Sequence, residues 1–430
     1  MKRKQFFTTV AAASLGSFGG YGLGSSRASG ISLPRDSGKI GTIAGKSLEE
    51  IRDIYRRDLF EDFLPAMENH VIDHEYGGFI CNLDIRTGER LSTGKRAWFE
   101  GRGMWVYSFL YNHIEQDPSF LEVARKSKDF ILEHEPADNS FWRASYTREG
   151  EPSSEGPGDI YCNLFIAEGL SEYAKASGES EYFDRAKSIL LDCLSRYDQP
   201  DYQHREQTPG IRLLGHWMVF LIASSQMLRQ QEDPEIRQVA DRSVEAIMNR
   251  HLNPEYNLLN EYMTHDMNRP ADNYEQYSYT GHAIETLWMV MFEAARRQDR
   301  DLFREAADAF KRHVTVAQDA VYGGYFRSLD HVDNHTWKVD KVLWLQEEVQ
   351  IGTMLMIEHM NDPWAKKIFA ENDAYIREKF VLPGYKFWPV SGDRIVEDHN
   401  TTRAGNYHHP RHLMLNLLAI ERLIDREGQA

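Results

Sequence analysis

From Ser47 onward, apolar residues recur at the three- and four-residue spacing of amphipathic helices. Ser47 and Glu50 form a capping box that opens the first helix. The pattern then predicts helices at residues 97–115, 119–135, 159–177, 180–195, 212–230, 233–250, 279–297, 299–314, 343–360, 363–379 and 407–425. The chain is therefore predicted to be all-α, with about twelve helices.

The helices after the first form pairs. Three of the second members open with Asp-Pro, at Asp117, Asp233 and Asp362, and these two residues suit the N-cap and the first turn. The short link within a pair requires antiparallel helices. Longer links between pairs are rich in aromatic residues and predict short hairpins at residues 76–80, 141–143, 322–326 and 385–389.

The first members of the pairs start near residues 97, 159, 212, 279, 343 and 407. This period of roughly 60 residues fits an open solenoid or a closed barrel of six inner and six outer helices. We favour the barrel, because a solenoid would have more uniform repeats and polar end caps. In a barrel, the N-terminal ends of the inner helices and the hairpins gather at one mouth.

Residues 1–35 are predicted to be an export leader and tether, which leaves residues 36–430 as a single barrel domain. Arg3 and Lys4 precede a short apolar run, as in a twin-arginine signal. We therefore expect a periplasmic or otherwise exported protein, with a cytoplasmic one as the alternative. No later apolar run is long enough to span a bilayer, so no membrane span is expected in the mature chain.

Composition narrows the chemistry. A net charge of −16 argues against a nucleic-acid partner. The cysteines Cys81, Cys162 and Cys193 have no metal-binding spacing, and neither a zinc motif nor a phosphate-binding glycine loop is present. An acid/base site without metal or cofactor is the remaining expectation.

Ionisable residues stand near the start of every inner helix, where a barrel core should be apolar. They are Arg102, Asp159, His216, His282 and Glu285, Glu348, and His408 and Arg411. Thr280 is the expected N-cap of its helix, and His282 and Glu285 share one face. A histidine beside a carboxylate can move protons near neutral pH. The alternative, a structural core histidine, is disfavoured by the convergence of charges on one mouth.

Aromatic residues accompany these charges. Trp98, Arg102 and Trp105 lie on one helical stripe, which suits a polyhydroxylated or anionic ligand. Trp344 and Glu348 also face one way. The expected substrate contacts are Trp98, Trp105, Tyr161, His216, Trp344, Trp388 and Arg411.

Five motifs carry a resemblance to a known family: Gly77-Gly78-Phe79, Trp98-Phe99-Glu100-Gly101-Arg102, Gly281-His282-Ala283-Ile284-Glu285, Trp344-Leu345-Gln346-Glu347-Glu348 and His408-His409-Pro410-Arg411. Over residues 50–425 the chain resembles the N-acylglucosamine 2-epimerase family, whose relatives include cellobiose 2-epimerases and mannose and sulfoquinovose isomerases. The resemblance implies an (α/α)6 barrel, in agreement with the helix count.

The resemblance also implies roles. His282 and His408 resemble the two proton-transfer histidines, and Arg102 the arginine near the carbonyl oxygen of the sugar. Glu285 and Glu348 resemble the carboxylates that orient the histidines and bind the hydroxyls involved in ring opening. Val219 falls where the isomerase and cellobiose branches carry a further histidine, which favours the acylglucosamine branch.

The expected activity is sugar 2-epimerisation through an enediolate, on a small-molecule sugar and without a nucleotide requirement. Aldose–ketose isomerisation is the first alternative, because it uses the same enediolate. A glycoside hydrolase or polysaccharide lyase that uses Glu285 and Glu348 is the second, and a non-catalytic sugar binder is the third. A homodimer is possible by analogy with the family.

Overall fold

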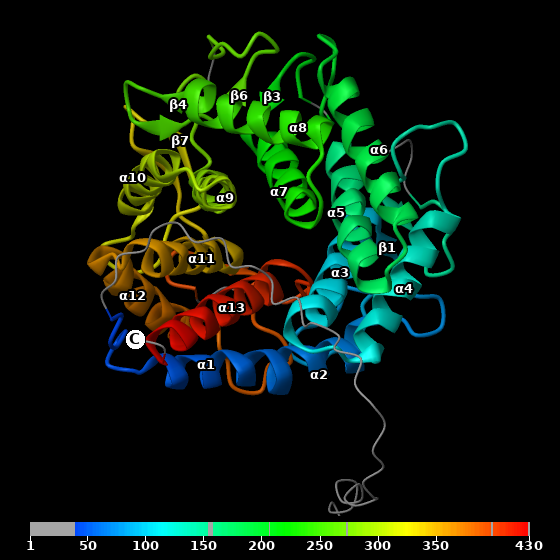
Figure 1. Cartoon of the computed structure of the whole chain (residues 1–430), viewed down its shortest axis with the longest axis horizontal. Coiled ribbons are helices and arrows are strands. Elements are labelled where there is room, and N and C mark those ends of the chain that lie inside the picture. Colours follow the sequence, from blue (N-terminus) through cyan, green and yellow to red (C-terminus); the bar gives the residue numbers. More distant parts are fainter. Residues whose placement is uncertain (1–38, 154–157, 206, 272–273, 397–398, 429–430) are drawn as a thin grey trace, which may run out of the picture. The chain divides into compact units, whose positions relative to one another are not determined.

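The computed structural model describes residues 39–153, 158–205, 207–271, 274–396 and 399–428. The predicted leader and tether over residues 1–35 lie outside these residues, so export stays a prediction. In the described part, twelve helical segments form a ring of six inner helices surrounded by six outer ones (Figure 1). The predicted all-α barrel is confirmed, and the open solenoid is wrong.

The inner ring consists of α3 (Ala97–Phe109, extended by the π-helical turn η3, Leu110–Ile114), α5 (Ile160–Ser177), α7 (Leu214–Gln230), α9 (Thr280–Arg297), α11 (Leu343–Met360) and α13 (His408–Gly428). The first outer segment runs through α1 (Leu48–Arg57), η1 (Asp58–Phe63), α2 (Leu64–Ala66) and η2 (Met67–Val71). The others are α4 (Pro118–Glu133), α6 (Glu181–Tyr197), α8 (Pro234–Glu245) with η4 (Ala246–His251), α10 (Arg300–Ala317) and α12 (Pro363–Lys379).

Contacts between the two ends of the described chain close the ring. Tyr55 of α1 hydrogen-bonds His412 of α13 through Oη and Nε2, 3.0 Å apart. Just before α13, the Asn406 side chain donates to the carbonyl of Phe99 in α3 at 2.9 Å. The last inner helix therefore packs beside the first.

Burial separates the inner helices from the outer ones. Every residue of α7 from Leu214 to Leu228 is buried, whereas α8 buries Ile236, Val239, Ala240 and Ser243 on one face. An inner helix is surrounded by its neighbours over most of its length, so its polar side chains contact the central cavity or find partners in adjacent elements, as Glu100 of α3 does with Ser127 of α4.

The predicted helix caps are mostly confirmed. Asp117, Asp233 and Asp362 each accept a backbone N–H of the first turn that follows, and Ser47 and Glu50 form both bonds of the capping box. The N-cap predicted at Thr280 is wrong: Tyr279 occupies that position, and the Thr280 hydroxyl donates to the carbonyl of Phe326 at 2.7 Å.

The predicted hairpins are largely wrong. Residues 141–143 and 385–389 form no strand, and the other two segments form single bridges, Ile72–Phe79 and Gln318–Tyr325. The strands instead pair as β1 (Lys95–Arg96) with β2 (Ser145–Tyr146), β3 (Arg212–Leu213) with β6 (Tyr262–Met263), β4 (Leu252–Asn253) with β5 (Leu258–Leu259), β7 (Ser328–His331) with β8 (Thr336–Lys338), and β9 (Lys341–Val342) with β10 (Ser391–Gly392).

Three of these strand pairs reveal an internal pseudo-threefold repeat. β1, β3 and β9 each lead directly into an inner helix, α3, α7 and α11. In register, Lys95 pairs with Tyr146, Arg212 with Met263 and Lys341 with Gly392, with the same chain separation each time. Every second inner helix therefore enters the barrel in an equivalent way.

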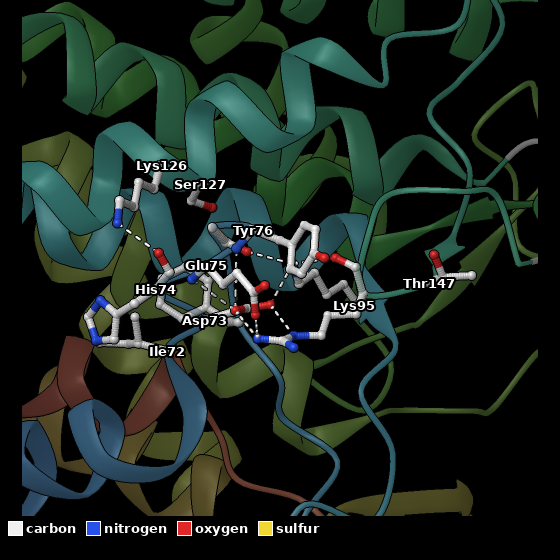
Figure 2. Close-up of polar contacts among 12 residues, drawn as sticks. Ile72, Asp73, His74, Glu75, Tyr76, Lys95, Lys126, Ser127 and Thr147 are labelled. Carbon is white, nitrogen blue, oxygen red and sulfur yellow. Dashed lines mark hydrogen bonds and ion pairs between the residues drawn. The ribbon is translucent and has the colours of Figure 1, made fainter.

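A buried ion pair anchors the loop before α3. The Asp73 carboxylate lies 3.1 Å from Lys95 Nζ with neither side chain exposed, and Lys95 also donates to the Gly77 carbonyl at 2.6 Å (Figure 2). Arg148 donates to the same carboxylate at 2.8 Å, and these partners hold the pKa of Asp73 at about 2 against burial.

The same arrangement recurs before α11. Asp319 lies 3.2 Å from Lys341, which donates to the Gly323 carbonyl at 2.7 Å, and Arg394 donates to Asp319. The two clamps fix the entry points of α3 and α11, whose second residues are Trp98 and Trp344.

Across the described residues, no helix combines the length and apolar character needed to cross a membrane.

Candidate active site

A cavity of about 1110 Å³ lies at the N-terminal ends of the inner helices. All six of these helices line it with residues of their first two turns, Trp98 and Arg102, Tyr161, Met218, His282 and Glu285, Trp344 and Glu347, and His408 and His409. The N-terminal ends of the inner helices therefore gather at one mouth of the barrel, as predicted.

His282 stands at the start of α9, with its Nδ1 3.0 Å from an oxygen of Glu261. Its side chain is 22% exposed, whereas that of Glu261 is 3% exposed. Burial alone would lower the pKa of His282, but the charge and hydrogen bond of Glu261, helped by Glu285, raise it above the ordinary value. The bond to Glu261 leaves Nε2 of His282 available to a substrate.

His408 forms a second dyad at the start of α13. Its Nδ1 lies 2.8 Å from Glu348, and Arg411 Nη2 approaches the same nitrogen at 3.2 Å. Burial, with Arg411 and Arg102 nearby, lowers the pKa of His408 well below the ordinary value, although Glu285 acts in the other direction. Near neutral pH His408 is therefore a neutral base, whereas His282 is more readily protonated.

Arg102 lies in the cavity wall within an aromatic cage. Its guanidinium carbon is 4.0 Å from the ring centre of Phe165, 4.7 Å from Tyr407 and 5.0 Å from Trp98. The buried Nε has no hydrogen-bond partner among the described residues. A rigid cation with a free N–H suits an oxyanion that forms during a reaction.

Arg411 holds together Glu285, which lines the cavity, and Glu348, which lies behind the cavity wall. Both accept from Arg411 Nη2 at 2.5 Å, and Glu348 also accepts from Trp288 Nε1 at 2.6 Å. With His408 they have the spacing of a metal-binding cluster. Arg411 already lies among these three side chains, so the protein supplies the positive charge that the carboxylates require.

The comparisons with known proteins agree with this geometry. The family model described as N-acylglucosamine 2-epimerase (GlcNAc 2-epimerase) matches residues 77–408. The chain belongs to the N-acylglucosamine 2-epimerase family. It is thus an enzyme of the isomerase class, in a family of carbohydrate 2-epimerases.

Relatives lie in two branches of the family. The chain is 24% identical over 335 residues to N-acylglucosamine 2-epimerase of Bos taurus, which covers 74% of this chain and 78% of that one. It is 22% identical over 394 residues to cellobiose 2-epimerase of Bacteroides fragilis, covering 85% and 97%. Cellobiose 2-epimerase from Bacillus thermoamylovorans B4167 superposes with a TM-score of 0.74 at 17% identity, covering 87% of this chain and all of that one, which shows the shared fold.

Trp344 separates the two dyads of this family member. Its ring centre lies 6.1 Å from that of His282 and 5.3 Å from that of His408. A methyl group at Gly281 would overlap the Trp344 indole. The absence of a side chain at Gly281 therefore makes room for the Trp344 indole.

Four residues predicted at the site lie behind the cavity wall. Trp105 is fully buried and donates to Gln226 at 2.7 Å. His216 lies behind Tyr161, with ring centres 4.7 Å apart, and both its nitrogens lack a partner in the described part of the chain. Glu348 and Arg411 support His408 from below. The prediction that Trp105, His216 and Arg411 contact substrate is therefore corrected, because packing turns these side chains away from the cavity.

The carboxylate that binds His282 is Glu261 and not Glu285, which its position on the same helix face had predicted. Glu285 shares its helix face but is bound by Arg411, whereas the partner of His282 is Glu261, between β5 and β6. No periodicity links Glu261 to a helix, so only the three-dimensional packing identifies it. Glu168 was missed as well: it is fully buried, accepts from the Tyr407 hydroxyl at 2.9 Å, and burial raises its pKa to about 7.

Proposed function

We propose that this chain is a sugar 2-epimerase of the N-acylglucosamine/N-acylmannosamine type, which transfers a proton at C2 through an enediolate. The observation that carries the proposal is the pair of cavity histidines, His282 and His408, each held through Nδ1 by its own buried carboxylate. Inverting C2 requires an acid/base group on each face of that carbon. Isomerisation to a ketose would need only one such group.

The two histidines differ in the way that this reaction requires. With the aldose open, neutral His408 takes the C2 proton on Nε2, and the electron pair forms the C1–C2 double bond with charge on O1. Arg102 stabilises that oxyanion. Protonated His282 returns a proton to C2 on the opposite face, and the C1=O1 bond forms again.

The geometry also weakens the hydrolase alternative. A glycoside hydrolase needs two carboxylic groups facing the scissile bond, one of them protonated. Glu285 and Glu348 instead share one guanidinium nitrogen, and their side chains are 3% and 0% exposed. Two carboxylates paired to the same buried cation cannot flank a substrate.

Export of this epimerase remains part of the proposal, on the basis of the basic and apolar leader at Arg3 and Lys4. A periplasmic enzyme would act without a nucleotide, since ATP is scarce there. Fractionation of cells that express the full chain tests the location.

The activity test is proton NMR of the purified protein in heavy water with N-acetylglucosamine, N-acetylmannosamine, mannose, glucose and cellobiose in separate tubes. Deuterium at C2 together with the 2-epimer is the expected result. His282→Ala and His408→Ala should each lower the rate of 2-epimer formation by a factor on the order of 10² to 10⁴. A ketose as the main product, or near-normal formation of the 2-epimer in either variant, would refute the proposal.

A further inference from the structure

The cavity contains a third histidine of the same construction. His409 Nδ1 lies 2.5 Å from Glu347, a carboxylate that is 1% exposed, and the His409 side chain is 12% exposed. Glu347 also lies 3.8 Å from Nδ1 of the buried His412. The bond at Nδ1 leaves Nε2 of His409 as the nitrogen that can exchange a proton with a ligand.

Aromatic rings hold His409 in place. Its ring centre lies 4.3 Å from Trp388 and 5.6 Å from Phe63, and all three side chains line the cavity. His408 is its neighbour along the helix, with Cα atoms about 3.8 Å apart. Consecutive side chains on a helix diverge by about 100°, so the two imidazoles face different parts of the cavity that they both line.

The proposed reaction leaves one proton-transfer task unassigned. Aldoses in water are mostly closed rings, whereas C2 becomes acidic only beside a free carbonyl. Opening the ring requires a proton on the ring oxygen and loss of the proton from the anomeric hydroxyl. His282 and His408 are committed to C2, and Glu285 and Glu348 are neutralised by Arg411.

We propose that His409, oriented by Glu347, is the general acid that opens the sugar ring. The C1–O5 bond breaks, its electron pair stays on O5, and O5 takes the proton from His409 Nε2. The anomeric O1–H proton passes to cavity water as C1=O1 forms, and water returns a proton to His409. This inference rests on the proposed function, since it assumes that the ligand is a cyclic aldose.

Mutarotation tests ring opening separately from C2 chemistry. Freshly dissolved α-N-acetylglucosamine converts to the β anomer through the open chain, so the wild-type protein should accelerate that conversion. We expect His409→Gln to slow enzyme-catalysed mutarotation at least tenfold, whereas His282→Ala should lose formation of the 2-epimer and keep mutarotation. Glu347→Gln, which removes the charge and keeps a hydrogen-bonding group, should show a smaller loss of the same kind.

His74→Gln is the matched control, because His74 pairs with Glu68 at 2.9 Å on the surface and is 51% exposed. Exchange at C2 of glyceraldehyde, which is too short to form a ring, gives a second readout that His409→Gln should change less than threefold. An equal loss on glyceraldehyde and on the cyclic sugar, or mutarotation as fast as in the wild type, would overturn the ring-opening role. If the wild-type protein accelerates mutarotation, His409→Gln slows it, and neither shows exchange at C2, the proposed function is refuted and His409 remains the ring-opening acid.

Discussion

Glu261→Gln is the substitution that most directly tests how the cavity charges His282. Glu261 accepts from His282 Nδ1 at 3.0 Å and is itself 3% exposed. Glutamine has nearly the same shape and can still accept that bond through its amide oxygen, so the imidazole should keep its orientation. What the substitution removes is the negative charge.

The size of that loss follows from Coulomb's law. Two unit charges with centres about 4 Å apart interact by about 4 kcal/mol at an effective dielectric constant of 20. Because His282 is 22% exposed, water screens part of this interaction. We take about half of it, about 2 kcal/mol, as the lower bound of the loss. Since about 1.4 kcal/mol is tenfold in rate, kcat should fall by a factor of about 30 to 1000.

The assay is the pH dependence of the formation of the 2-epimer. Glu261 raises the pKa of His282 in the wild type, so the activity that requires protonated His282 should persist to higher pH than in Glu261→Gln. The pH dependence of the unfolding free energy is an independent test of the raised His282 pKa. A raised histidine pKa stabilises the fold below the ordinary value of 6.5, and this contribution is lost as pH rises through the folded-state pKa. The difference in unfolding free energy between wild type and variant should therefore be largest below pH 6.5 and should shrink above it.

Glu68→Gln on the surface is the control, because Glu68 pairs with His74 in the same way but remains 58% exposed. A rate of 2-epimer formation within threefold of wild type and an unchanged pH profile in Glu261→Gln would show that the charge of Glu261 does not act on His282.

Three further predictions concern the frame of the site. Gly281→Ala should lower the unfolding free energy by about 1–3 kcal/mol, measured by denaturant titration, because its methyl group would overlap the Trp344 indole. Arg102→Lys should reduce kcat/KM by a factor on the order of 10² to 10³ in the C2 exchange assay, since lysine replaces a stacked planar cation by a mobile point charge; wild-type kinetics would contradict this. Asp73→Asn should destabilise the fold by about 3–5 kcal/mol in thermal or denaturant unfolding, because it removes the carboxylate that pairs with the buried Lys95 and with Arg148; a loss under 1 kcal/mol would contradict the anchoring role.

The helices could be predicted because their signals are local. Asp-Pro dipeptides and apolar spacing specify where Pro118, Pro234 and Pro363 start their helices, whatever lies around them. The prediction of hairpins was wrong because backbone groups of these segments hydrogen-bond to side chains of other elements. The N–H of Phe79 donates to the Glu100 side chain, and that of Tyr325 donates to Gln346. Aromatic content alone could not distinguish these loops from strands.

The candidate histidines could be predicted, but their partners could not. Helical spacing correctly placed His282 and Glu285 on one face, yet the residue that binds His282 comes 21 positions earlier, from a loop. His408 and Glu348 are 60 residues apart and meet only because the barrel closes. Spacing indicates which side chains share a direction, whereas long-range packing decides which atoms bond.

The pseudo-threefold repeat explains how a near-symmetric barrel holds an asymmetric site. The sixth residue of α3, α7 and α11 is Arg102, Val219 and Glu348, respectively. Equivalent entry geometry gives the three side chains related positions around the barrel axis, so their chemical differences determine how the cavity is polarised. The arginine faces the cavity as a free cation, the valine is apolar, and the glutamate lies below and holds His408.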